Sequence, residues 1–167
     1  MVTDVSDTEL QRMKAIAESV PDPELPMVNI GDLGMVREVA RSEDGFVVAL
    51  TPTYSGCPAT EMIQTSVERD LREAGWSNVR VVLRRSPAWT TDWITEAGRE
   101  KLRNHGIAPP ALPVVGDGTA LFVDRKVSCP WCGSFETERL AEHGATPCKA
   151  LYRCTHCREP FDHFKCH

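Results

Sequence analysis

Apolar positions near the start of the chain recur every three or four residues, which is the spacing of one face of an α-helix. Five residues form this face: Leu10, Met13, Ile16, Ala17 and Val20. Ser6 and Glu9 have the spacing of a capping box, in which two side chains satisfy the first free amides of a helix. The pattern predicts a first helix over residues 7–19.

Three short runs rich in β-branched and apolar residues follow, and each predicts a strand. They cover residues 33–40, 46–50 and 79–83. The connection before the second run ends in Asp44-Gly45, a pair that is typical of β-hairpins. Between the second and third runs, apolar residues at helical spacing predict a helix over 59–74 that ends at Gly75. This order of elements predicts a small two-layer α/β domain.

The periodic pattern weakens after Ser86. A third helix is predicted over 92–104, although Gly98 lowers the helix propensity of this segment. Residues 105–119 contain three prolines and three glycines with no periodic pattern, which is typical of a connector. We therefore expect three parts: an α/β domain over 1–104, a linker over 105–123 and a small zinc β-ribbon over 124–167.

Composition and charge exclude several classes of protein. With 41% hydrophobic and 26% charged residues in 167, the chain is globular rather than disordered or fibrous. The net charge of −5 arises entirely within residues 1–85, which hold 14 acidic and 9 basic side chains. An acidic surface does not attract a phosphate backbone, so we expect no nucleic-acid partner.

The cysteines are distributed unevenly, and their meaning depends on the compartment. Residues 1–20 mix charged and apolar positions without the apolar centre of a signal peptide, and no later run is long enough to span a membrane. We therefore expect a cytoplasmic protein with no membrane partner. Six of the seven cysteines lie in the last 39 residues, and in that compartment they are metal ligands rather than disulfide partners.

Two C-x2-C knuckles form the most specific pattern in the chain. They are Cys129-Pro-Trp-Cys132 and Cys154-Thr-His-Cys157. Each knuckle places two sulfurs on one side of a tight loop, and two facing knuckles make a tetrahedral site of four thiolates. Four thiolates leave no open position, so we expect a structural zinc ion, with iron as the alternative metal for such a site.

Cys148 and Cys166 are not needed by this count. One interpretation is that both are small buried apolar residues. The other is that they have a function, as auxiliary ligands, as a redox pair or as an exchange site for iron.

Cys57 stands apart from the other cysteines. It precedes Pro58, which occupies the favoured first position of a helix, so the macrodipole would favour the thiolate of Cys57. The alternative is a buried residue at the helix entry. Asp22 and Glu24 lie beside prolines, and by position alone they are turn formers.

Longer motifs resemble known families. Asp22-Pro-Glu-Leu-Pro26, Ile30-Gly-Asp-Leu-Gly-Met-Val36 and Thr51-Pro-Thr-Tyr-Ser-Gly-Cys-Pro58 resemble the iron-sulfur cluster assembly domain family that includes SufT-like proteins. Three tail motifs extend the likeness: Cys129-Pro-Trp-Cys132, Cys148-Lys-Ala-Leu-Tyr-Arg-Cys154 and Phe161-Asp-His-Phe-Lys-Cys-His167. With them, nearly the whole chain resembles the PaaD family, which supplies one subunit of the phenylacetyl-CoA epoxidase system.

The resemblance implies a function and a site. PaaD-like proteins assist the assembly of iron-sulfur or di-iron centres in the epoxidase of aerobic phenylacetate degradation. Its oxygenase and reductase subunits would be the partners, together with general iron-sulfur assembly proteins. Cys57 would be the functional thiol that holds iron or a cluster transiently, and Asp22, Glu24 and Thr53 would line the same surface. No residue is assigned a catalytic role.

Two other functions fit the sequence. One is a structural adaptor that docks oxygenase components through its zinc ribbon. The other is a thiol enzyme with Cys57 as nucleophile, for which no histidine base precedes His105.

Overall fold

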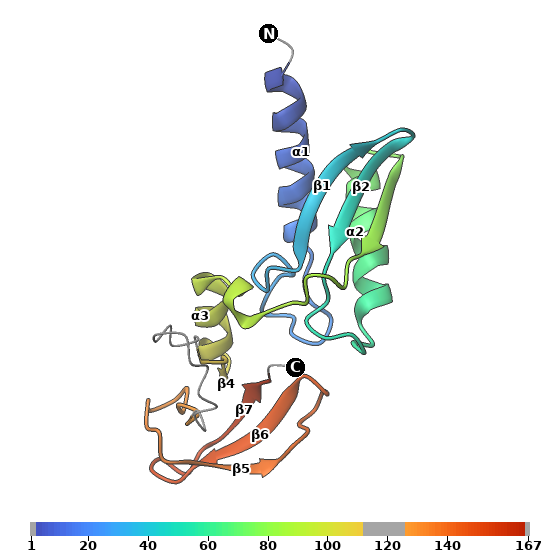
Figure 1. The fold of residues 1–167 in the computed structure, drawn as a ribbon. Coiled ribbons are helices and arrows are strands. Elements are labelled where there is room, and N and C mark those ends of the chain that lie inside the picture. Colours follow the sequence, from blue (N-terminus) through green and yellow to red (C-terminus); the bar gives the residue numbers. More distant parts are fainter. Residues whose placement is uncertain (1–2, 112–125, 166–167) are drawn as a thin grey trace, which may run out of the picture. The chain divides into compact units, whose positions relative to one another are not determined.

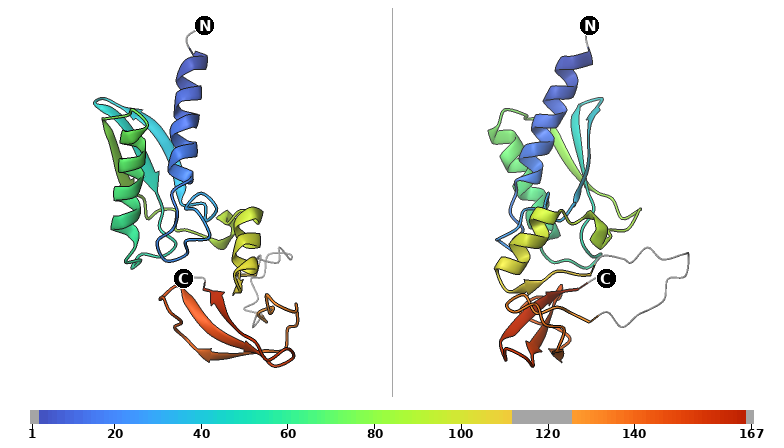
Figure 2. Two further views of the ribbon diagram at one scale, coloured as in Figure 1. Left: turned by 180° about the vertical axis from the view of Figure 1, so that it is seen from behind. Right: turned by 90° about the vertical axis from the view of Figure 1, so that its left-hand side faces the viewer.

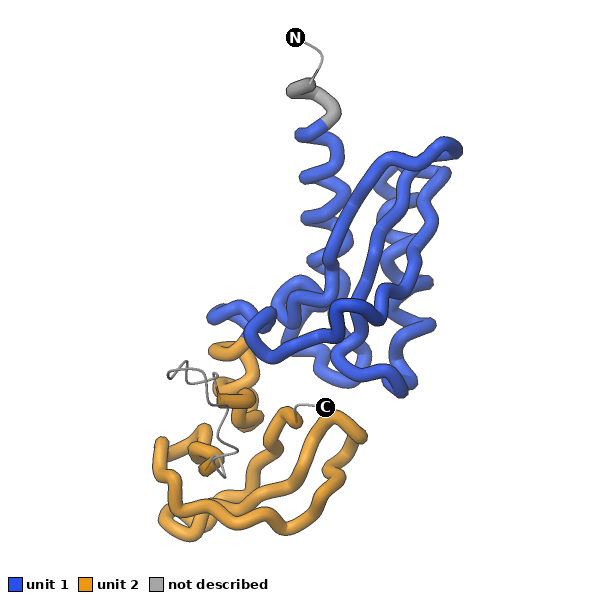
Figure 3. Tube along the Cα trace, in the orientation of Figure 1, with its two compact units in different colours: residues 1–98 blue, residues 99–167 orange. Residues whose placement is uncertain are grey.

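The computed structural model describes residues 3–111 and 126–165, and the chain forms two compact units (Figures 1 and 3). Unit 1 comprises residues 1–98 and unit 2 comprises residues 99–167. The division between the units precedes the domain end expected at residue 104. The later part of the expected linker, from residue 112, lies outside the described residues.

Unit 1 is built on a three-stranded sheet in the order β1-β2-β3. The strands are β1 (Val36–Ser42), β2 (Gly45–Leu50) and β3 (Val79–Leu83). β1 and β2 form an antiparallel hairpin, whereas β2 and β3 are parallel, so the chain crosses over between them through a helix. This confirms the predicted hairpin and the predicted third strand.

Two helices cover one face of this sheet (Figure 2). They are α1 (Thr3–Glu18) and α2 (Thr60–Glu73). α2 buries Ile63, Val67 and Leu71, which lie four residues apart on one side of the helix. Burial of each such side chain contributes about 1.5–3 kcal/mol, so the apolar stripe holds the helix on the sheet. The predicted α/β two-layer class is therefore confirmed.

Two predicted boundaries in unit 1 are wrong. α1 begins at Thr3, so Ser6 lies inside the helix and the capping box predicted from Ser6 and Glu9 does not mark its start. The first strand begins at Val36 rather than at residue 33 because the segment before it forms turns. There the Gly34 amide donates to the Gly31 carbonyl, and Gly34 adopts a positive φ of 66°.

Unit 2 contains a four-stranded sheet in the order β4-β7-β6-β5. Its strands are β4 (Ile107–Ala108), β5 (Thr137–Ala141), β6 (Lys149–Cys154) and β7 (Pro160–Phe164). β4 and β7 are parallel, and the other neighbours are antiparallel. The two residues of β4 belong to the segment expected to be a linker, and such a short strand carries no periodic signal.

The helix predicted over 92–104 is divided. Thr91–Trp93 forms a short 3-10 turn, labelled η1, and α3 follows at Glu96–Asn104. Gly98 allows a close approach within unit 1, because a Cβ there would lie 2.8 Å from the Asp32 carbonyl oxygen. In the part of the chain that the structure describes, no helix combines the length and apolarity needed to cross a membrane.

Candidate metal centre and thiol site

Four cysteine sulfurs of unit 2 lie close enough together to hold one metal ion. The Sγ atoms of Cys129, Cys132, Cys154 and Cys157 all lie within 4.8 Å of one another. The Sγ atoms of Cys129 and Cys157 are 3.7 Å apart, and those of Cys132 and Cys154 are 3.6 Å apart. Sulfurs that bind zinc at about 2.3 Å in a tetrahedron lie about 3.8 Å apart, so the four thiols fit this ion.

Backbone amides approach the first sulfur of each knuckle in the same way. The Cys132 amide donates to Cys129 Sγ, and the Cys157 amide lies 3.5 Å from Cys154 Sγ and donates to it. The bond from Cys157 is the main cause that lowers the pKa of Cys154 to about 7. Burial nevertheless raises the pKa of Cys129, and the pKa values of Cys132 and Cys157 are raised as well, so the amide bonds favour a thiolate at Cys154 among the four ligands.

The metal group also forms part of the small core of unit 2. Cys129 and Cys154 are buried with exposures of 2% and 0%, and they pack with Ala108 and Phe161. Tyr152 stacks on Phe161 with 5.8 Å between the ring centroids. An ion held by these four sulfurs would join the two knuckles to this apolar cluster and add folding free energy to unit 2.

Of the two other tail cysteines, the structure describes one. Cys148 is buried, and its Sγ lies 3.1 Å from Thr146 Oγ1. Among the described residues, Cys148 does not belong to the metal group. Cys166 lies outside the described residues.

Cys57 lies in a turn before α2. The helix begins at Thr60 with Ala59 as its N-cap, so the prediction that Pro58 is its first helical residue is wrong. The Thr60 hydroxyl donates to the Cys57 carbonyl at 2.8 Å, and the Cys57 amide donates to the Tyr54 carbonyl at 3.3 Å. Two turns therefore fix the backbone on both sides of the thiol.

The Cys57 thiol is half-buried, and burial raises its pKa above the ordinary value. The Ala59 amide and the Thr60 hydroxyl act in the opposite direction, while repulsion from Glu24 and Asp22 raises the pKa further. Burial therefore outweighs the hydrogen bonds that favour the thiolate of Cys57. In the absence of a bound cation, Cys57 is a neutral thiol at pH 7.

Asp22 holds the proline-rich loop in shape. Its side chain is buried, and Oδ1 accepts hydrogen bonds from the amides of Glu24 at 2.8 Å and Leu25 at 2.9 Å. Burial raises the pKa of the Asp22 carboxyl, while the two amide bonds oppose this rise. The same carboxyl acts electrostatically on Cys57, so one side chain is coupled to both the loop and the thiol.

The loop after β2 contains residues that the sequence analysis did not single out. Thr51 is 2% exposed, and its Oγ1 has no hydrogen-bond partner in the described part of the chain. The Tyr54 ring lies against Gly56, where a Cβ would approach Tyr54 Cε2 to 2.8 Å. Thr53, which the sequence analysis did select, is half-buried in the same loop.

Two sequence families match successive parts of the chain. Residues 13–83 match the family described as iron-sulfur cluster assembly protein, and this range contains Cys57, Asp22, Glu24 and Thr53. Residues 116–165 match the family described as PaaD zinc beta ribbon domain, and this range contains both knuckles. The zinc ribbon predicted from the knuckle spacing is confirmed.

Individual relatives agree with these matches. The chain is 46% identical over 162 residues to an Escherichia coli (strain K12) protein named as a component of the "Putative 1,2-phenylacetyl-CoA epoxidase", covering 97% of this chain and 96% of the relative. It is 38% identical over 80 residues to the "Fe-S protein maturation auxiliary factor" of Porphyromonas gingivalis, covering 47% of this chain and 75% of that protein.

A solved structure shows the same fold for the first part of the chain. The crystal structure of a domain of unknown function, DUF59, from Bacillus anthracis superimposes with a TM-score of 0.53 and 27% identity. The match covers 57% of this chain and 92% of that domain.

Proposed function

The chain belongs to the PaaD family of phenylacetyl-CoA epoxidase components, and on this premise we propose that it matures metal centres in partner subunits. An accessory role follows from the family. The further step is that Cys57 holds iron or an iron-sulfur cluster transiently and passes it to an iron-sulfur or di-iron centre. The recipients are the oxygenase and reductase subunits of the epoxidase system, and general iron-sulfur assembly proteins supply the cargo.

The observation that carries this proposal is a free, half-buried thiol at Cys57, on which two carboxylates act, within the segment that matches the iron-sulfur assembly family. Glu24 and Asp22 both act on the Cys57 thiol and oppose its ionisation. A ferrous ion beside these groups would reverse the effect, because its positive charge stabilises the thiolate and both carboxylates. The thiol therefore ionises when the cation arrives and takes up its proton again when the cation leaves.

The ligand set also supports transient rather than permanent binding. One thiolate and oxygen ligands suit ferrous iron, whereas four thiolates close a site. Asp22 Oδ1 already accepts two backbone amides, which limits what this oxygen can give to a metal. A site with so few free ligands releases its ion readily to a partner protein that offers a larger number of ligands.

A second candidate function is structural docking of oxygenase components through the zinc ribbon. One observation favours it: Trp131 in the first knuckle is 53% exposed, and Phe135, shortly after the knuckle, is 60% exposed. Aromatic side chains with this exposure are enriched at protein interfaces. Stable stoichiometric copurification with mature oxygenase subunits would support this adaptor function, and release of the protein after maturation would support the leading proposal.

Coexpression with the partner subunits tests the proposed function. The Cys57→Ala variant should fold and bind about one zinc per chain, and the partner subunits should then contain less iron than with the wild-type protein. Ser55→Ala is the matched control, because Ser55 is exposed in the same loop. Partner subunits with full iron content beside Cys57→Ala would contradict the proposal.

A further inference from the structure

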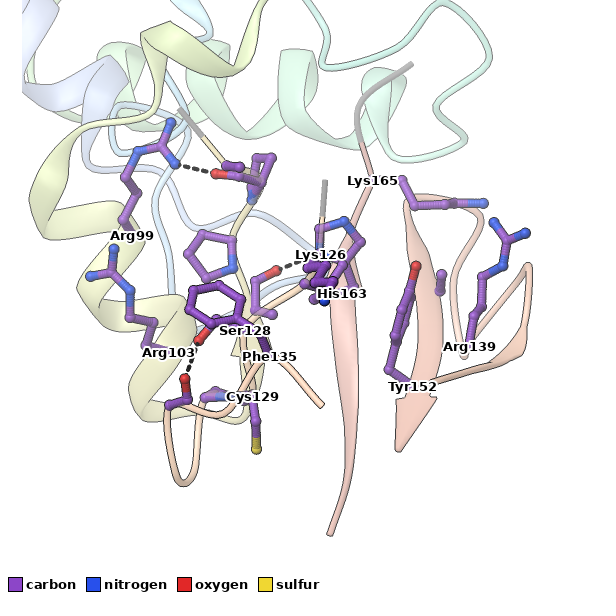
Figure 4. Close-up of a pocket in the computed structure, with 18 of the residues that line it drawn as sticks. Arg99, Arg103, Lys126, Ser128, Cys129, Phe135, Arg139, Tyr152, His163 and Lys165 are labelled. Atoms are coloured by element: carbon purple, nitrogen blue, oxygen red, sulfur yellow. Dashed lines mark hydrogen bonds between the residues drawn. The ribbon is translucent and has the colours of Figure 1, made fainter. Parts of the chain in front are cut away.

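A cavity of about 710 Å³ lies within unit 2 (Figure 4). Its described walls come from α3, the segment 108–111, the first zinc knuckle and strands β5 to β7. Pockets for small molecules have volumes of about 300–1,000 Å³. The cavity therefore has the size of a ligand site, and neither Cys57 nor the proposed maturation function depends on it.

The described walls carry a strong excess of positive charge. Five permanently cationic side chains line the cavity, and Glu142 is the acidic side chain among the described lining residues. The five are Arg99, Arg103, Lys126, Arg139 and Lys165. Unit 2 has ten basic and eight acidic residues over 99–167, whereas the described lining has five cations to one carboxylate, so the fold concentrates the cations at the cavity.

Glu142 compensates only part of this charge. Its carboxylate lies 2.7 Å from Arg139 and 3.9 Å from Lys165, so one negative charge is shared by two cations. Lys165 also donates to the Glu142 carbonyl at 2.8 Å, and its side chain is only 11% exposed. A partly buried ammonium group is stabilised by a nearby anion, and a ligand can supply one.

Lys126 adds a further positive charge to the wall. Its side chain is exposed, and no described residue forms an ion pair with it. In Figure 4, Arg139 and Lys165 lie on one side of His163, and Arg103 lies on the other. The cations are therefore spread along the cavity, which suits a ligand with more than one negative group.

Aromatic rings complete the walls. Phe135 is 60% exposed and lines the cavity, so its ring is available for stacking. The Tyr152 ring is held by Phe161 and by His163, whose ring meets it edge-on at 5.5 Å. A planar heterocycle stacks on rings of this kind with favourable free energy.

His163 contributes a hydrogen-bond acceptor. Burial lowers the pKa of His163, so its imidazole is neutral at pH 7. Its Nδ1 lies 3.1 Å from the Ala108 carbonyl oxygen, and a neutral ring that donates there keeps an acceptor at Nε2. Such an acceptor matches an amino group on a heterocycle.

We propose that this cavity binds a ligand that joins phosphate groups to a planar heterocycle, as in a nucleoside diphosphate. The cations Lys126, Arg139 and Lys165 bind the phosphates, and Phe135 stacks on the heterocycle. The shared chemistry has two sources: a free nucleotide or the nucleotide end of a coenzyme A thioester. A purely apolar ligand would leave the cationic walls without an anion, and a simple anion would leave the exposed aromatic wall without a partner.

Isothermal titration of the zinc-loaded full-length protein tests this proposal with four probes: ADP, adenosine, pyrophosphate and acetyl-CoA. ADP should bind, and adenosine and pyrophosphate should each bind at least about 10-fold more weakly because each lacks half of the recognised chemistry. Tighter binding of acetyl-CoA than of ADP would identify the thioester as the source. Binding of acetyl-CoA that is equal to or weaker than that of ADP would identify the free nucleotide as the source.

Variants locate the site. Lys126→Gln and Arg139→Gln should each weaken ADP binding about 10-fold, which is the effect of losing one charge-assisted hydrogen bond. Arg153→Gln is the control, because Arg153 follows Tyr152 on β6, points to the opposite face and does not line the cavity. Zinc content verifies that each variant is folded. Absence of binding by all four probes, or equal loss in the control, would overturn the proposal.

Discussion

Gly133 and Arg158 adopt the same left-handed backbone conformation, with φ of 75° and 67°. Each directly follows the second cysteine of its zinc knuckle. A left-handed conformation costs a residue with a side chain about 1–2 kcal/mol, and glycine avoids this cost. The second knuckle therefore carries a strain that the first does not, and the two positions form a matched pair.

Substitutions at this pair should have different effects on the stability of the ribbon. A Cβ at Gly133 would meet no atom within 4 Å, so Gly133→Ala introduces backbone strain without a clash and should lower the free energy of unfolding by about 1–2 kcal/mol. Arg158→Gly removes the strain and should not destabilise the ribbon. Thermal unfolding of both zinc-loaded variants measures this, and a stabilised Gly133→Ala would contradict the account of the knuckles.

The zinc content of the protein should depend on the knuckle cysteines and not on Cys148. Cys132→Ser removes one of four ligands, so the purified variant should contain far less than one zinc per chain and lose the ordered structure of unit 2. Cys148→Ala should retain about one zinc per chain, because Cys148 lies outside the metal group. Metal analysis measures the zinc content of each variant, and circular dichroism measures its ordered structure. Loss of zinc from Cys148→Ala would show that Cys148 takes part in the site.

The reactivity of Cys57 should depend on pH in a way that reports its carboxylate neighbours. Since burial and repulsion by Glu24 and Asp22 raise the pKa of the thiol, its rate of alkylation should increase at higher pH than for an ordinary cysteine. Glu24→Gln removes one repulsive charge, stabilises the thiolate and should shift the rate profile to lower pH.

Glu73→Gln, at the C-terminal end of α2, is the control for that shift. A profile for Glu24→Gln that coincides with the wild-type profile would mean that Glu24 does not act on the thiol. The measurement uses iodoacetamide and the metal-free Cys57 site, with the knuckle cysteines protected by zinc.

Asp22 should have separable effects on loop stability and on the thiol. Asp22→Ala removes the acceptor for two amides and should destabilise unit 1 by about 1–3 kcal/mol. Asp22→Asn keeps an oxygen acceptor, so urea unfolding should show a much smaller loss, while alkylation of Cys57 should still shift to lower pH. Equal destabilisation by both substitutions would show that the carboxylate charge, rather than the acceptor geometry, holds the loop.

Local patterns predicted the parts of the fold that depend on neighbouring residues. The strand over 79–83 and the two knuckles follow directly from β-rich composition and from C-x2-C spacing, and the helix predicted over 59–74 is α2 with slightly different ends. The start of that helix matters most. Proline is favoured at the first position of a helix, and Pro58 meets this rule. In the structure, the Thr60 hydroxyl donates to the Cys57 carbonyl within a turn, and the helix begins only at Thr60.

Features that depend on contacts between distant residues were not predictable in this way. The pKa of Cys57 is raised by burial and further by Glu24 and Asp22, which lie more than thirty positions earlier in the chain. β4 has only two residues and pairs with β7, which lies more than fifty positions later in the chain. No local sequence pattern predicts such a pairing. The cationic cavity is assembled from α3, the first knuckle and β5 to β7, so its excess of positive charge does not follow from the composition of unit 2, which has ten basic and eight acidic residues.

The most direct test of the central claim is transfer of iron from purified protein to a purified apo partner subunit. The wild-type protein and Cys57→Ala are incubated anaerobically with ⁵⁷Fe(II), freed of unbound metal and mixed with the apo oxygenase subunit, whose iron content is then measured after separation. The wild-type protein should deliver iron, and Cys57→Ala should deliver only the amount found without any donor. Equal delivery by the two proteins would contradict a role for Cys57 as the thiol that carries the metal.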